Sequence, residues 1–300
     1  MTLFDTTVAE GRVPGATPLA VEPEHQGWRV LLRDRTAVFG LGVVALLSLA
    51  AVLAPLLAPH NPNAVDAVNK LAAPSLDHPL GTDHLGRDNL SRLLFGARLT
   101  IGTAVVASAA VAGIGIVLGV LAGYFGGVVD AVISRVIDIL LAFPTFLVAL
   151  AVTGALGPGL GHVAISLIVV WWARYARIVR SAVIAERAKP YVEAARAVGT
   201  PRSRTVVSHV LPNIIAPVVV LTTLDTGDLL LGISALSFLG LGVQPPAAEW
   251  GAMLSEARTY LSSDPLLMLW PGLALFLMVL GFNLLGDGLR DVLDPRTRRR

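Results

Sequence analysis

Two aspartates lie three residues apart in a stretch that is otherwise apolar. Asp225 and Asp228 interrupt the run 214–236, and residues at this spacing are neighbours on a helix. Carboxylates are costly inside a bilayer and usually face a cavity or a partner. Two interpretations follow. The pair lines a path and meets a cationic group of a solute. Alternatively, it pairs structurally with an arginine of this chain or of a second subunit.

Other polar residues give weaker signals for chemistry. His78, Asp83 and His84 are close in sequence and could suggest a metal ion, and His209 could suggest acid–base chemistry. His209 is more simply explained by packing or a hydrogen bond. The chain has no cysteine, which excludes cysteine-based metal clusters and thiolate nucleophiles. We predict neither a metal site nor a catalytic residue.

Two motif searches bear on enzymatic function. The segment 232–236 reads GISAL and lacks the closing glycine of the GxSxG elbow of serine hydrolases. A phosphate-binding GxxxxGK[ST] loop needs a lysine directly after glycine. The two lysines, Lys70 and Lys189, follow Asn69 and Ala188. We therefore predict that the chain is not an enzyme, binds no cofactor and cannot itself be an ATPase.

The composition indicates that a lipid bilayer is the solvent. The 300 residues are 54% hydrophobic and 15% charged, with a mean hydropathy of +0.71. Soluble domains carry roughly 25% charged residues. The formal net charge of +2 does not indicate binding to nucleic acid.

The apolar stretches predict an all-α polytopic membrane protein with six spans. A spanning helix needs about 20 mostly apolar residues. The expected spans are 38–57, 99–125, 139–156 with a kink at Pro144, 161–185, 214–236 and 265–285. An alternative with four spans treats 161–185 and 214–236 as re-entrant pieces.

Lysine and arginine placement predicts the orientation, because short loops rich in these residues stay in the cytoplasm. With both termini inside, most of the 23 lysines and arginines are cytoplasmic. The outside segments then hold Lys70, Arg87, Arg92, Arg98 and Arg258.

The same pattern divides the chain into segments. Residues 1–27 are rich in Pro, Gly and acids and are expected to be a disordered cytoplasmic extension; the first apolar run begins too late for a signal peptide. Residues 28–58 are expected to hold an interfacial helix and the first span. An extracytoplasmic loop (59–98), a five-helix core (99–287) and a basic cytoplasmic tail (288–300) follow.

Within the span 99–125, Gly115, Gly119 and Gly123 form two overlapping GxxxG patterns. Glycines at this spacing let a second helix approach closely in lipid. We expect this face to pack against another helix.

The polar segment 186–213 separates two apolar stretches. Pro190 suits the first turn of a helix, and Tyr191, Ala194, Ala195 and Val198 then share one face. We expect Gly199 to end this helix, and Thr200-Pro201 to begin a second short helix that reaches about Val210. The small side chains at the centre of the stripe would let its backbone sit deep in a groove, either of a partner or under the bundle itself.

The polar segment resembles the EAA loop of ABC importer permeases, through Glu193, Ala194, Ala195, Gly199, Leu211 and Pro212. More narrowly, residues from about 28 to 296 resemble the shorter, C-type subunit of the dipeptide/oligopeptide/nickel permease family. The resemblance rests on runs such as HPLGTD (78–83), RYARIVR (174–180), HVLPN (209–213), LSFLGLGVQPP (236–246) and FNLLGDGLRDVLDPR (282–296). His78 and Asp83 belong to the HPLGTD run. Ile233 is a departure, because the family often has an acid there.

The resemblance implies a type I ABC importer permease (MetI-like) fold and a mechanism. Residues 191–198 would be the coupling helix, which seats in a cleft of a separate ATPase. Glu193 would be its polar contact and Gly199 its hinge. The implied partners are a second homologous permease, two cytoplasmic ATPase subunits that bind ATP and Mg²⁺, and an extracytoplasmic substrate-binding protein.

The resemblance also implies a location in the bacterial cytoplasmic (inner) membrane and a substrate class. Dipeptides or oligopeptides are expected, with nickel or glutathione as alternatives. A stand-alone secondary transporter is the remaining alternative. Such transporters commonly contain inverted repeats, and the sequence shows no convincing internal repeat.

Overall fold

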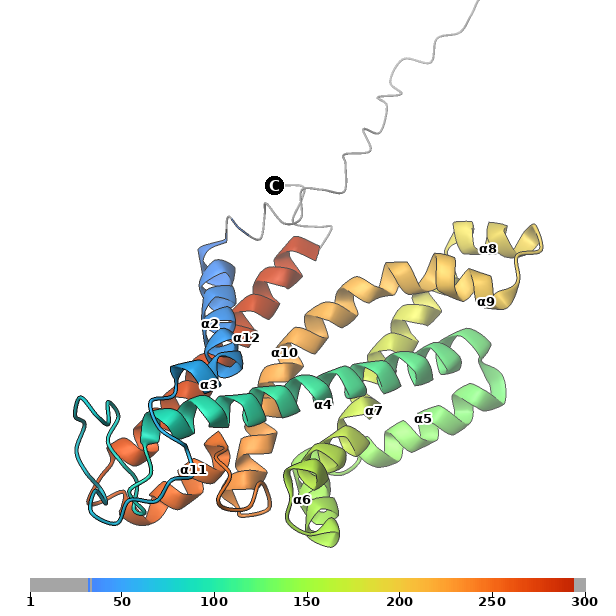
Figure 1. Cartoon of the computed structure of the whole chain (residues 1–300). Helices are drawn as coiled ribbons and strands as arrows, with labels where there is room; N and C mark the ends of the chain where they lie inside the picture. Colours follow the sequence, from blue (N-terminus) through green and yellow to red (C-terminus); the bar gives the residue numbers. More distant parts are fainter. Residues whose placement is uncertain (1–31, 33, 294–300) are drawn as a thin grey trace, which may run out of the picture.

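The computed structural model describes residue 32 and residues 34–293, which fold into a helical bundle without strands among them (Figure 1). Segment 1–27, most of the expected interfacial stretch and the tail from 294 lie outside the described residues. The helices are α2 (Arg35–Val52), α3 (Ala54–Leu57), α4 (Asn89–Phe125), α5 (Gly127–Leu141), α6 (Thr145–Leu156), α7 (Leu160–Arg187), α8 (Pro190–Ala197), α9 (Arg202–Thr205), α10 (Leu211–Phe238), α11 (Trp250–Ala257) and α12 (Leu266–Leu293).

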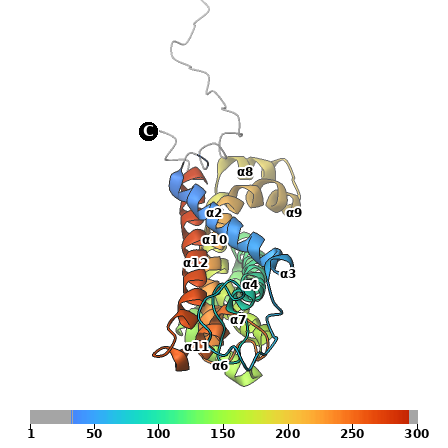
Figure 2. The ribbon, with the colours of Figure 1, turned by 60° about the vertical axis from the view of Figure 1, so that its left-hand side comes forward.

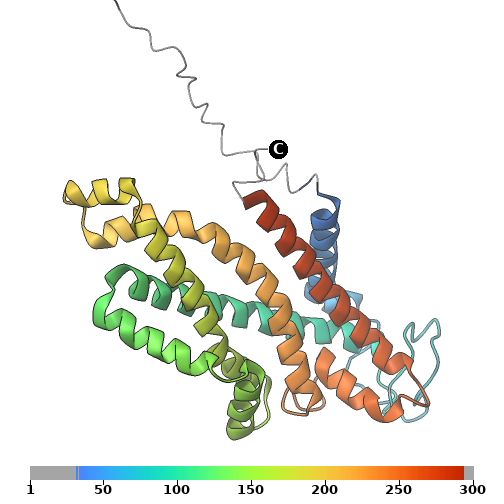
Figure 3. The same cartoon turned by 180° about the vertical axis from the view of Figure 1, so that it is seen from behind.

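The long helices confirm a membrane fold. Five helices are long and apolar enough to cross a membrane, and a sixth span results if α5 and α6 are counted as one bent pair. Figure 3 shows α8 and α9 at one end of the bundle and α11 toward the opposite end, which we call the α8 end and the α11 end. In Figure 2, α2 lies beside α12. Their close approach is at Gly40, where an added Cβ would lie 2.8 Å from the Gly281 carbonyl oxygen.

The second span starts earlier than the sequence predicts. α4 begins at Asn89 rather than at residue 99, because Asp88 caps it by accepting a hydrogen bond from the Ser91 N–H at 2.8 Å. An N-cap carboxylate satisfies a free helix N–H and interacts favourably with the helix dipole. The first turns of α4 are polar, so hydropathy alone places the start too late.

The span expected at 139–156 is not one kinked helix. α5 and α6 meet at 88° across a break of a few residues around Pro144. Proline has no N–H to donate and disfavours helical geometry in the residue before it, so the helix ends there. α5 itself was missed, because Asp130, Arg135 and Asp138 lower its hydropathy.

The three glycines of α4 pack against α7, as their spacing predicts. A Cβ on Gly119 would lie 2.7 Å from the Ala176 carbonyl oxygen, and one on Gly123 would lie 2.8 Å from that of Arg180. A Cβ on Gly115 would overlap Tyr175. The helices therefore touch backbone to backbone along this line.

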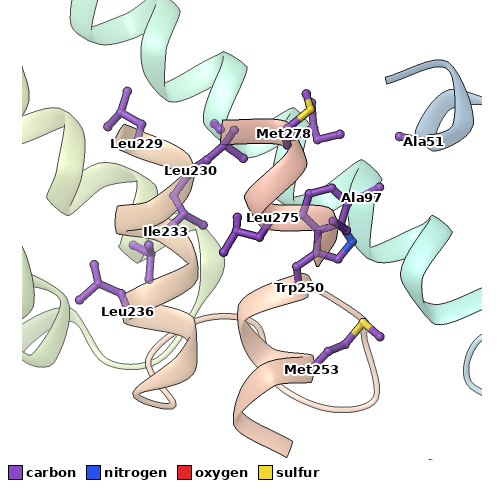
Figure 4. Packing of buried hydrophobic residues seen from close by; sticks show 14 of the residues in the cluster. Ala51, Ala97, Leu229, Leu230, Ile233, Leu236, Trp250, Met253, Leu275 and Met278 are labelled. Atoms are coloured by element: carbon purple, nitrogen blue, oxygen red, sulfur yellow. The ribbon is translucent and has the colours of Figure 1, made fainter. Parts of the chain in front are cut away.

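A large apolar core lies toward the α11 end (Figure 4). Leu229, Leu230, Ile233 and Leu236 of α10 pack there with side chains of α11 and α12. Trp250 of α11 is buried, and its indole N–H donates to the Leu93 carbonyl of α4 at 3.0 Å. Ile233, at the position where an acid is common in the family, is fully buried.

A network of charged side chains lies at the α11 end beside this core. Glu256 accepts hydrogen bonds from Arg87 at 2.7 Å and from Arg92 at 3.0 Å. Arg87 also donates to Asp83 at 2.6 Å. Both arginine side chains are at most 2% exposed. The network ties the segment before α4 to α11.

Candidate functional site

The helix that carries the EAA pattern ends as the sequence predicts. Gly199 has a φ of +82°, in the left-handed region that favours glycine. Its N–H donates to the Arg196 carbonyl at 2.9 Å, and the Thr200 N–H donates to that of Ala195 at 3.1 Å. These two bonds form a Schellman motif, which ends α8 and turns the chain toward α9.

One side of α8 is anchored and the other is open. Val192 is fully buried against valines of α7 and of the segment before α10, which are Val179, Val183, Val206 and Val210. Ala194 and Glu193 are exposed, Val198 is 82% exposed, and Ala195 is half-buried. The predicted stripe therefore faces away from the bundle. The anchor Val192 was not predicted, although a valine between polar neighbours on a short helix is a signal for it.

Tyr191 belongs to both sides of α8. Its ring is partly exposed, while its hydroxyl donates to the Glu186 carboxylate at the end of α7. The same hydroxyl contacts the His209 carbonyl at 3.2 Å and accepts from the Asn213 amide at 3.0 Å. Partial burial, followed by the hydrogen bond to Glu186, raises the pKa of Tyr191 to about 12. The hydroxyl thus joins α8 to α7 and to the start of α10.

The second half of the loop differs from the prediction. Pro201, not Thr200, occupies the N-cap, and no side chain caps α9. No break follows near Val210, because a π-helical turn (Val206–Val210) joins α9 directly to α10. Leu211 packs partly buried against the valine cluster, and Pro212 is exposed in the first turn of α10. Pro212 has no N–H to donate, and the helix continues past it through the π-helical turn.

The two aspartates of α10 have different surroundings. Asp225 is buried, and one of its carboxylate oxygens lies 3.4 Å from the Arg174 guanidinium of α7. Its other oxygen is buried without a hydrogen-bond partner within residues 34–293. Asp228 is exposed on the bundle surface. The sequence analysis treated the two acids as one pair. In the structure, Asp225 lies beside an arginine, whereas Asp228 is exposed.

Two ion pairs between α5 and α7 were not predicted. Asp130 binds the guanidinium of Arg180 with both carboxylate oxygens, and Asp138 accepts from Arg177 at 2.7 Å. Asp130 and Asp138 lie on one face of α5 at helical spacing. Matching this face to the arginines of the RYARIVR run is the signal that could have revealed α5.

The histidines of the α11 end lie near carboxylates. Within the described residues, two groups bring their ligand atoms within 4.8 Å of one another: His60, His78, Asp88; and Asp83, His84, Glu256. Each carboxylate already has hydrogen-bond donors, since Asp88 caps α4 and the other two acids bind arginines. These side chains hold the segment before α4 in place, and the sequence prediction of no metal site stays a prediction.

Known proteins resemble this chain over most of its length. The profile of the family described as binding-protein-dependent transport system inner membrane component matches residues 115–299. The profile of the N-terminal TM domain of oligopeptide transport permease C matches residues 24–74. Both matches confirm the resemblance read from the sequence motifs.

Three relatives illustrate the range. The dipeptide transport system permease protein DppC of Alkalihalophilus pseudofirmus is 41% identical over 279 residues, covering 93% of this chain and 92% of the relative. The nickel transport system permease protein NikC of Escherichia coli K12 is 45% identical over 253 residues, covering 84% and 91%. The glutathione transport system permease protein GsiD of Escherichia coli O6:H1 is 42% identical over 277 residues, covering 92% and 91%. With a helical membrane bundle, an EAA loop on an exposed short helix and these matches, the chain belongs to the family of binding-protein-dependent transport system inner membrane components, the permeases of ABC importers.

Proposed function

We propose that this permease forms part of a translocation path for dipeptides or oligopeptides and is driven by a separate ATPase that grips α8. The observation that carries the proposal is the open stripe of α8, where Ala194 and Val198 face away from the bundle while Val192 is anchored. A stripe of small side chains on an anchored helix suits insertion into a groove of a soluble partner. Glu193, exposed beside the stripe, supplies a polar contact.

The structure suggests how a displacement of α8 would reach the membrane. The Tyr191 hydroxyl binds groups of α7 and α10, and α9 continues into α10 without a break. A push on α8 would therefore move two spans together. ATP-driven closure of the ATPase pair would alternate the path between outward and inward access.

The proposed topology places both termini and the α8 end in the cytoplasm of a bacterial inner-membrane protein. The arginine distribution supports this orientation, because α7 and the loop after it carry a dense set of arginines toward the α8 end. The proposed assembly contains a second permease, two ATPase chains that bind ATP and Mg²⁺, and an external substrate-binding protein.

The coupling role is tested with substitutions on the open face of α8. Ala194→Trp and Glu193→Lys should each weaken ATPase association, with Ala194→Trp costing about thirtyfold, because a bulky side chain cannot enter a groove that fits alanine. The measurement is co-purification of the ATPase chains together with ATP-dependent uptake in vesicles. Ala67→Trp, at an exposed alanine of the α11 end, is the control and should leave both normal. Normal uptake and assembly in the Ala194 and Glu193 variants would refute the role of α8.

The substrate is proposed from the relatives and from the charge on α10. The exposed carboxylate of Asp228 would complement the ammonium group of a peptide amino terminus. Nickel and glutathione are the alternatives, because relatives with those printed names are as similar as the dipeptide permease. Titration of the cognate external binding protein with dipeptides, longer peptides, glutathione and Ni²⁺ distinguishes them. Tight binding of Ni²⁺ alone would overturn the peptide assignment. Uptake without any ATPase would favour a secondary transporter instead.

A further inference from the structure

A second feature of the α8 end lies on the opposite face of α8 from the stripe of small side chains. A cavity of about 450 Å³ opens where α4 and α7 end and where α8 turns into α9. It is lined by Tyr124, Phe125, Arg187, Arg196, Thr200 and Arg202. Arg196 lies about half a turn around α8 from the stripe, so the cavity and the stripe occupy different faces of this helix.

Three arginines line this cavity. Arg187 is held in place by a hydrogen bond to the Tyr124 carbonyl at 2.6 Å. The Arg196 guanidinium sits over the Tyr124 ring, 5.0 Å from its centroid. Within residues 34–293, no ion pair joins a carboxylate to Arg187, Arg196 or Arg202. A cavity lined by three guanidinium groups offers positive charge and N–H donors, which complement an anion.

The position of the cavity favours an anion that belongs to the membrane. α4 and α7 are both spans, and their last residues, Phe125 and Arg187, are on its wall. Phe125 is half-exposed and packs edge-on against the buried Tyr124, so an aromatic pair lies where the span ends. A soluble partner that docks on the stripe would approach α8 from its other face.

We propose that this cavity binds the phosphate of an anionic phospholipid headgroup. Arginine offers paired N–H donors that match phosphate oxygens, and basic pockets between membrane helices on the cytoplasmic side bind such headgroups. The Thr200 hydroxyl is available as a further donor. A bound phosphate would join α8 and α9 to the ends of α4 and α7. The inference requires only that α4 and α7 cross a bilayer, so it stands even if α8 docks no ATPase.

The test uses the full importer complex in neutral detergent. Its thermal stabilisation is titrated with phosphatidylglycerol, with phosphatidylcholine and with inorganic phosphate, and native mass spectrometry counts the phospholipids retained. Phosphatidylglycerol should stabilise the complex at concentrations where the other two do not. The double variant Arg196→Gln/Arg202→Gln should weaken this response about 25-fold, because each arginine near a membrane surface contributes about fivefold. The single variant Arg202→Gln should weaken the response about fivefold. Arg204→Gln removes the same single charge from the same short helix but outside the cavity wall, and it should change the response less than twofold.

Three results would overturn the proposal. Equal stabilisation by phosphatidylcholine would mean that the cavity does not distinguish an anionic headgroup from a zwitterionic one. Equal stabilisation by inorganic phosphate would assign the cavity to a soluble anion. Loss of the ATPase chains from the double variant, with lipid retention unchanged, would assign the arginines to a carboxylate of the ATPase. Thermal unfolding of the lipid-free double variant close to that of the unmodified complex excludes misfolding as the cause of a lost response.

Discussion

Asp225 and Asp228 are neighbours on α10, yet one is paired with Arg174 and the other faces outward. Asp228→Asn should lower uptake several-fold with the complex intact, because only an open carboxylate can meet a solute. Asp225→Asn should instead reduce stability by about 1 kcal/mol, because it weakens an interaction with a buried acid. Vesicle uptake and thermal unfolding of each purified variant measure the two effects. Unchanged uptake in Asp228→Asn would remove this acid from the path.

The Tyr191 hydroxyl gives a second prediction for a single residue. Tyr191→Phe should uncouple ATP hydrolysis from uptake while ATPase binding persists, because the ring remains on the stripe but the links to Glu186 and Asn213 are lost. Hydrolysis and uptake measured in the same vesicles provide the comparison. A fall in both by the same factor would indicate lost docking instead.

The pKa of Tyr191 determines the pH range of this link. Because the folded pKa is raised to about 12 from 10.0, the fold favours the neutral hydroxyl. Its contribution is fully present below about pH 10 and is lost as pH rises toward 12. The difference in tyrosinate absorbance between the unmodified chain and Tyr191→Phe should therefore titrate near pH 12. A midpoint near 10 would contradict the hydrogen bond from Tyr191 to Glu186.

At the scale of elements, the contact between α4 and α7 depends on glycines, which have no side chain to hold the two helices apart. Gly119→Ala should destabilise the protein by about 1–3 kcal/mol, because its methyl group would press on the Ala176 carbonyl. Gly113→Ala is the matched control on the same helix, since an added Cβ there meets nothing within 4 Å. Alanine favours a helix over glycine by about 1 kcal/mol, so the control should be neutral or stabilising. Thermal unfolding in detergent distinguishes the two, and equal shifts would contradict the close packing.

The elements that the sequence predicts well are those with one dominant signal. The GxxxG face, the helix at Pro190 and the helix end at Gly199 were all predicted, because glycine permits close packing and left-handed backbone geometry and the proline ring fixes φ. α5 was missed since its charges are satisfied by Arg177 and Arg180 of a distant helix. The continuity of α9 with α10 was also missed. Pro212 predicts a break in the helix, whereas the π-helical turn before it carries the helix past this position.

At the scale of the whole molecule, the charged network at the α11 end binds the segment before α4 to the bundle. Glu256→Gln should destabilise the protein by about 3 kcal/mol, because two nearly buried arginines lose their shared counter-charge. Asp77→Asn, an exposed acid of the same region, should change stability by less than about 0.5 kcal/mol. Thermal unfolding measures both, and a small effect at Glu256 would mean that Asp83 alone compensates Arg87 and Arg92.

The helix that runs from Arg202 to Phe238, through the π-helical turn and past Pro217, has a mechanical consequence. At 37 residues it is about 55 Å long, and its far end is wedged beside Trp250 and Gly251, where Gly251 would overlap Ser234 if it carried a Cβ. When a long helix is held at one end and displaced at the other, each residue moves in proportion to its distance from the held end. Asp228 lies nearer the held end than the α9 end, so a displacement of α9 reaches this carboxylate reduced in size.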